Sequence, residues 1–153
     1  AMRQHPQETT VQVYGCGVLD MLAWNDNSNK VSIATALEIT TAGGISVVLE
    51  TMRQHPQDIN VQHYGCQALA TLAFNNDNSV SIATTGGISA VLGAMRQHPQ
   101  ETTVQVYGCG VLDMLAWNDN SNKVSIATAL EITTAGGISV VLETMRQHPQ
   151  DIN

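Results

Sequence analysis

Charged residues are scarce in this sequence: Asp, Glu, Lys and Arg together make up 12% of its 153 residues, against roughly a quarter in an average protein. The 13 acidic and 6 basic side chains give a net charge of −7 and form no basic stripe. Nucleic-acid binding depends on clustered Lys and Arg, so we expect no nucleic-acid partner. A surface built from Gln, Asn, Thr and Ser in place of charges resists self-association only weakly.

Long apolar runs and the motifs of catalysis are absent too. The sequence has no secretory leader and no apolar run long enough for a membrane span, so we expect no membrane partner. Its Gly-Gly pairs lack the Gly-Lys-Ser/Thr of a phosphate-binding loop. Four histidines precede prolines without the closely spaced second ligand of a zinc site: His5, His55, His98 and His148. We expect no enzyme activity, no cofactor and no metal, and assign these histidines to helix C-terminal ends.

Cysteines are few, and their spacing argues against disulfide bonds. Cys16, Cys66 and Cys109 each follow Tyr-Gly, so they occupy one repeated helix position. Packed helices lie about 8–10 Å apart, whereas a disulfide needs Cα atoms closer than about 7 Å. We therefore expect free, buried thiols, which weakly favour a reducing compartment such as the cytoplasm.

What the sequence does contain is repetition. Residues 94–153 repeat residues 1–60 letter for letter, and Met-Arg-Gln-His-Pro-Gln occurs four times. The chain divides into repeat units at 1–50, 51–93 and 94–143, with a partial unit at 144–153. Repeats of this length stack so that each unit buries its apolar face against its neighbours. We expect one array over residues 1–153, and a segment of a longer array because no polar capping unit closes either end.

Each unit predicts a set of helices. Residues 9–25 carry apolar side chains at spacings of three and four, which predicts an amphipathic helix. Thr9 or Thr10 is expected to cap its start, and Asn60 the start of the second copy. A short helix follows, then a turn at the Gly-Gly pair, then a middle helix over 45–55 that ends at His-Pro.

Two motifs carry a resemblance to a known family. Gly-Gly-Ile-Ser-Val-Val-Leu opens the middle helix, and Tyr-Gly-Cys-x-x-Leu-x-x-Leu-Ala lies in the long third helix. This order resembles armadillo repeats; HEAT repeats, with two helices per unit and usually no glycine corner, come second. The resemblance implies an all-α fold, a right-handed α-solenoid of three-helix units whose third helices line a concave groove.

The peptide-binding mechanism of armadillo proteins does not transfer to this chain. Importin- and catenin-like members hold peptides with a Trp and an Asn four residues apart on each third helix. Gly17, Gln67 and Gly110 stand at the Trp position, and the Asn position holds Met21, Thr71 and Met114. Exposed Met and aromatic residues could form an adhesive strip instead.

The candidate residues for such groove contacts are Met21, Trp24, Gln67, Thr71, Phe74, Met114 and Trp117. Alternatively, the three aromatic residues among them pack under the next short helix. Asp20 and Asp113 on the same helices either attract basic partners or are solvated.

An insert distinguishes alternate units. Residues 34–43 are six longer than their counterpart 83–86, and solenoid insertions often map to a binding face. We expect its apolar residues to make lateral contacts, or else to pack against their own neighbours: Leu37, Ile39, Leu130 and Ile132.

Three functions are compatible with these features. The first is a non-enzymatic structural scaffold that assembles with itself, end to end or laterally, into a long array or filament. The second is a module that binds a protein or peptide in the concave groove. The third is an engineered repeat protein, which the uneven unit lengths argue against.

Overall fold

The computed structural model describes residues 1–23, 38–116 and 132–149, and this part of the chain is helical, with no strand. None of the helices in these ranges is long and apolar enough to cross a membrane. The described helices are α1 (Thr9–Ala23), α3 (Gly44–Gln54), α4 (Ile59–Leu72), α5 (Asn76–Thr84), α6 (Gly87–Gln97), α7 (Thr102–Ala116) and α9 (Gly137–Gln147). The all-α prediction is confirmed for this part of the chain.

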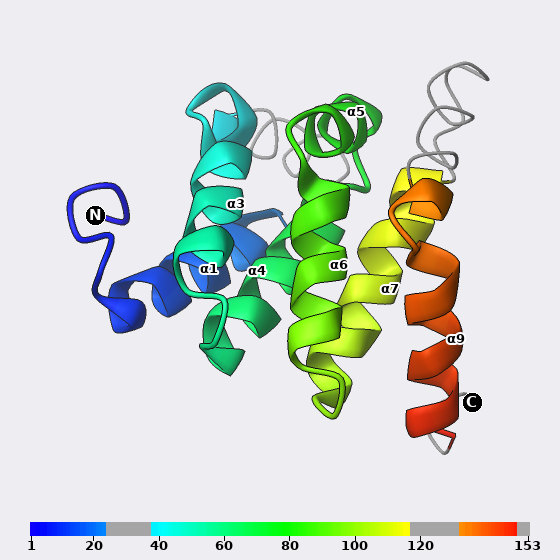
Figure 1. Cartoon of the computed structure of the whole chain (residues 1–153). Helices are drawn as coiled ribbons and strands as arrows, with labels where there is room; N and C mark the ends of the chain where they lie inside the picture. The colour runs from blue at the N-terminus through cyan, green and yellow to red at the C-terminus, as the bar shows by residue number, and fades with distance from the viewer. Residues whose placement is uncertain (24–37, 117–131, 150–153) are drawn as a thin grey trace.

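The helices form two rows, as Figure 1 shows. The long helices α1, α4 and α7 pack side by side in one row, and the middle helices α3, α6 and α9 stand side by side in the other. Two of the middle helices also pack on the long helix that follows them, α3 on α4 and α6 on α7. Equivalent helices of successive units therefore lie next to one another.

The helix boundaries follow local capping chemistry. At the start of α4, the Asp58 side chain accepts a hydrogen bond from the backbone N–H of Val61 at 3.0 Å. The sequence-based assignment of this cap to Asn60 was wrong, because Asn60 already lies inside the helix. The glycine corner is confirmed: Gly43, Gly86 and Gly136 have φ values of 77°, 88° and 80°, a region that other residues rarely adopt.

Glycines inside the long helices make room for methionines of the preceding middle helix. A Cβ on Gly65 would lie 2.6 Å from Cγ of Met52, and one on Gly108 would lie 2.7 Å from Cγ of Met95. Both methionines are almost fully buried. A glycine at this position therefore allows the middle helix to approach the long helix closely, and the methionine is the side chain that requires it.

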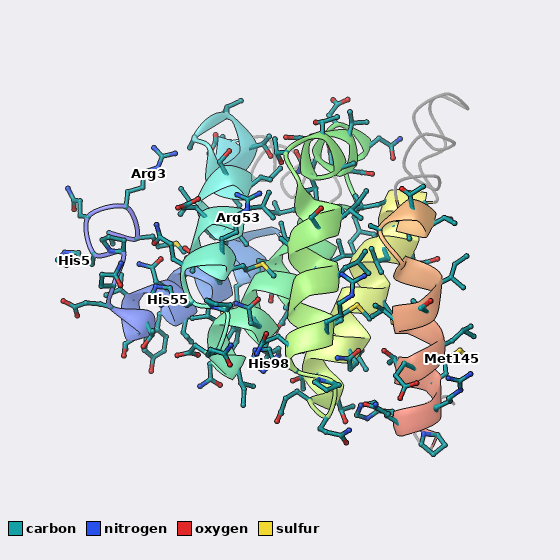
Figure 2. The ribbon with its side chains drawn as sticks, in the orientation of Figure 1. Arg3, His5, Arg53, His55, His98 and Met145 are labelled. Carbon is teal, nitrogen blue, oxygen red and sulfur yellow. The ribbon has the colours of Figure 1, made fainter. Side chains whose placement is uncertain are left out.

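The same hydrogen bonds between helices recur at matching positions in successive copies of the repeat. Nε2 of Gln62 donates to the Met52 and His55 carbonyls at 2.9 and 2.8 Å. The equivalent glutamines, Gln12 and Gln105, donate to the corresponding Met and His carbonyls of their own copies. In the first three Met-Arg-Gln-His-Pro-Gln copies, the arginine binds a carbonyl just before the next glycine corner along the chain: Arg3 to Ala42, Arg53 to Thr85 and Arg96 to Ala135. Three labelled residues of this repeating pattern, Arg3, Arg53 and His55, can be followed in Figure 2.

The insert is only partly described. Ile39 is buried, close to Gly44, and Ile132 packs half-buried against the core. The structure thus places Ile39 in the core of its own chain, the alternative to the lateral contact expected from the sequence. Leu37 and Leu130 lie outside the described residues.

Candidate functional site

A buried carboxylate lies between two long helices. Asp20 of α1 is 7% exposed. Its Oδ2 accepts a 2.7 Å hydrogen bond from Nε2 of Gln67, and its Oδ1 accepts a 2.5 Å hydrogen bond from Oγ1 of Thr71. Residues four apart share a helix face, so both donors on α4 reach the same carboxylate. Asp20 is consequently a buried, hydrogen-bonded group rather than a solvated one.

An aromatic stack lies beside this carboxylate. The His63 ring stacks on Tyr64 with centroids 4.5 Å apart and on Tyr107 of α7 at 5.4 Å. Burial lowers the pKa of His63, and this effect is opposed by the Asp20 charge and by a hydrogen bond to Gln67. Because the pKa falls below its usual value near neutrality, His63 is mainly uncharged at pH 7.

A hollow of about 420 Å³ lies beside the carboxylate and is lined by Asp20, Met21, Gln67, Thr71 and Tyr107. Met21 is 76% exposed and provides an apolar wall next to the carboxylate. The hollow combines apolar and hydrogen-bonding groups, which is typical of sites that hold a side chain or a small ligand.

The structure brings together three of the predicted groove residues, Met21, Gln67 and Thr71. Phe74 is exposed, so it does not pack under the next short helix, whereas Met114 packs half-buried against the core. Trp24 and Trp117 lie outside the described residues. The sequence analysis missed Tyr107 as a lining residue, and no single-unit pattern marks it.

Nucleophilic and metal chemistry finds no support in the described residues. Burial raises the pKa of both Cys16 and Cys66 to about 12, so these thiols stay protonated near neutrality. All three cysteines are free, with Cys109 half-buried, in agreement with the prediction of unpaired thiols. No group of three His, Cys, Asp or Glu side chains in the described ranges could hold a metal ion.

The proline-linked histidines form contacts between units. Nε2 of His55 lies 2.6 Å from the Pro6 carbonyl oxygen, and Nε2 of His98 lies 2.7 Å from that of Pro56. His148 makes the equivalent contact with Pro99 at 3.0 Å. Each histidine ends a middle helix and donates to the turn of the unit before it, so its repetition follows the repetition of the junction.

The two ends of the helix rows carry open apolar faces. Because residues 1–60 and 94–153 have the same sequence, identical side chains can be compared in different places. Val18 on α1 is 53% exposed while Val111 on α7 is 0% exposed, and Leu142 on α9 is 49% exposed while Leu49 on α3 is 1% exposed. The difference arises only from which helix lies next to each residue.

The first open face comprises Tyr14, Val18 and Leu22 of α1, and the second comprises Ile138, Leu142 and Met145 of α9. Figure 2 shows Met145 on the outer side of α9, away from α6. The described residues thus present two kinds of candidate site, the hollow beside Asp20 and the open end faces. Comparison of the chain with known protein families, with curated proteins and with solved structures finds no match.

Proposed function

We propose that this chain is a non-enzymatic structural scaffold, a right-handed α-solenoid of armadillo type that forms part of a long or self-associating array. Several features support the proposal. Equivalent helices of successive units lie side by side, a left-handed glycine precedes each described middle helix, and the same Gln, His and Arg hydrogen bonds recur from one copy of the repeat to the next.

One observation carries the proposal: the open faces at both ends consist of side chains that the identical sequence buries elsewhere in the same chain. Ile45, Leu49 and Met52 are buried, whereas their copies Ile138, Leu142 and Met145 are exposed. Burying one such side chain stabilises by about 1.5–3 kcal/mol. Covering these exposed side chains with a second copy of the chain would remove apolar surface from water, which favours self-association.

Association of the chain with itself tests the proposal. Light scattering over a range of protein concentrations should show a mass that rises with concentration, and negative-stain images should show elongated particles. Val18→Glu places a charge on the open face of α1 and should reduce the association without lowering the thermal midpoint.

Val111→Glu is the matched control, because it makes the same change at the same repeat position inside the helix row. It should lower the thermal midpoint strongly, since a charge would be buried without a partner. A wild-type chain that stays monomeric at high concentration, with Val18→Glu indistinguishable from it, would contradict the proposal.

The hollow beside Asp20 favours a second function, binding of a protein or peptide segment along α1, α4 and α7. The exposed Met21 next to a hydrogen-bonded carboxylate is the observation behind it. A peptide array probed with the full chain tests this idea. Peptides that bind the wild type but not Met21→Glu would support it, and peptides that bind both equally would not.

A further inference from the structure

We propose that the open face of α7 is a docking site for a helix of the α4 type, and that Asp113 selects this helix over one of the α1 type. The proposal rests on the proposed function, in which further units stack on the ends. We call α1 and α7 odd-type helices and α4 an even-type helix. Asp113 would thus favour an alternating order of odd-type and even-type helices along the row.

The α1–α4 junction provides the template, because α1 and α7 have the same fifteen-residue sequence. On α1, Cys16 and Asp20 are buried by the neighbouring α4. On α7, the copies of these residues are less covered: Cys109 is half-buried and Asp113 is exposed. The face that receives an even-type helix is therefore present on α7 and open.

Three features of α4 match the odd-type face. The Tyr64 ring lies over Gly17, where a Cβ would be 3.7 Å from Cδ1 of the ring. Gln67 and Thr71 donate to the two oxygens of Asp20. On α7, no atom lies within 4 Å of a Cβ placed on Gly110. The matching partner is thus a helix that carries Tyr, Gln and Thr at positions i, i+3 and i+7.

An odd-type helix lacks two of these three groups. It has the tyrosine, Tyr14, but Gly17 and Met21 stand where α4 has Gln67 and Thr71. A second copy of the chain joined end to end would bring such a helix, α1, to the open face. Asp113 would then be buried without a hydrogen-bond donor, so end-to-end association of separate copies should be weaker than addition of an even-type unit.

The junction between α4 and α7 shows the opposite arrangement. At the position of Asp20, α4 carries Ala70, and α7 carries Gly110 and Met114 at the positions of Gln67 and Thr71. Ala70 and Met114 both pack half-buried against the core. Polar groups therefore meet polar groups at one junction and apolar groups meet apolar groups at the other, so each helix type is better matched to the opposite type than to its own.

Two extended chains test this selection. The first is the full chain followed after Asn153 by residues 61–93 of its own sequence, which keeps the repeat in register because Asp151-Ile-Asn153 is a sequence copy of Asp58-Ile-Asn60. The second is identical, except that the copies of Gln67 and Thr71 in the extension are replaced by Gly and Met. Both carry Val18→Glu, and sedimentation confirms that the samples compared are monomeric.

The readouts are urea unfolding and the rate at which Cys109 reacts with a thiol reagent. The even-type extension should raise the urea midpoint and slow labelling of Cys109 about tenfold or more, as expected when a half-buried thiol becomes fully buried. Asp113→Ala should lower the folding equilibrium constant of this chain about tenfold. The same substitution should have little effect on the unextended chain, in which Asp113 is exposed.

The Gly and Met version separates the possible failures. If Asp113 selects the helix type, this version stabilises less, and Asp113→Ala improves it. If both extensions stabilise and protect Cys109 equally, the face accepts any helix and the selection proposed here is overturned, while stacking stands. If neither extension protects Cys109, the face accepts no further unit, and the proposed function itself fails.

Discussion

The Thr71 hydroxyl donates a 2.5 Å hydrogen bond to the Asp20 carboxylate across the junction of α1 and α4. The two residues belong to different units and to helices of different type. Their contact exists only where an odd-type helix is followed by an even-type one. A polar pair at the centre of a helix–helix junction specifies its partner as well as contributing to stability, because either wrong neighbour leaves a buried polar group unpaired.

Thr71→Val tests the contribution of this bond to stability. The substitution keeps the shape of the side chain but removes a donor to a buried carboxylate, so we expect the free energy of unfolding to fall by about 1–3 kcal/mol. Urea unfolding at pH 7 measures the change. Thr41→Val is a control, because Thr41 is exposed and donates only to the nearby Glu38 carbonyl. Equal effects of the two substitutions would show that the Asp20 contact adds nothing.

Gly65→Ala should destabilise the chain despite the higher helix propensity of alanine. The new methyl group would lie within 2.8 Å of both Cγ and Sδ of Met52, a buried side chain with little room to move. We expect a loss of about 1–3 kcal/mol from overpacking, measured by thermal unfolding.

Gly110→Ala is the matched change on the open face, where a Cβ meets no atom within 4 Å. Replacing a helical glycine with alanine there should stabilise by about 0.5–1 kcal/mol. Opposite signs for the two glycines are the result expected. If Gly65→Ala also stabilises, the contact with Met52 does not explain the glycine.

Some of this fold could be predicted from the sequence, because the signals are local. The apolar spacing of residues 9–25 and the Gly-Gly pair at 43–44 depend only on near neighbours, and both predicted elements are present. Asp58 is a favourable residue for the cap, but the other copies have Thr10 and Thr103 at the position of Asn60, and this pattern favoured a cap two residues too far along the chain.

The candidate site was harder to predict, because its state depends on the next unit. Asp20 and Asp113 share the same surrounding sequence, yet one is buried and the other exposed. Val18 and Val111 differ in the same way. No pattern read within one unit distinguishes the members of either pair, since the cause is the helix packed beside them. The sequence does contain one signal for the Asp20 contact: long helices that carry an aspartate alternate with one that carries Gln67 and Thr71.

The stability of the chain should fall at alkaline pH because of its buried thiols. Burial raises the pKa of Cys16 and Cys66 from 9.0 to about 12. Above pH 9 the unfolded chain loses thiol protons that the folded chain retains, so the unfolded state is favoured as pH rises from 9 towards 12. Each such thiol weakens folding by up to about 1.4 kcal/mol per pH unit in this window. Below pH 8 the two thiols should cause no dependence on pH.

A Cys16→Ala/Cys66→Ala double variant isolates this effect from other alkaline titrations. Its free energy of unfolding, measured by urea at pH 7.5 and at pH 10.5, should change less than that of the wild type. Cys109→Ala is the comparison. Burial also raises the pKa of Cys109, but this thiol is only half-buried. Equal pH dependence in all three proteins would mean that the buried thiols do not govern alkaline unfolding.

An arginine that binds a carbonyl at a glycine corner should contribute more to stability than one that only pairs with an exposed residue of its own helix. Nη2 of Arg53 donates to the Thr85 carbonyl at 3.0 Å, whereas Arg146 pairs with Glu143 of its own helix on an exposed surface. Methionine keeps most of the apolar stem but has no donor, so Arg53→Met should cost about 0.5–1.5 kcal/mol. Arg146→Met should cost less than about 0.5 kcal/mol, since exposed helix pairs contribute little. Urea unfolding of both variants decides the matter. A larger loss for Arg146→Met would show that the contact with the Thr85 carbonyl contributes little to stability. The recurrence of arginine at this position would then have another cause.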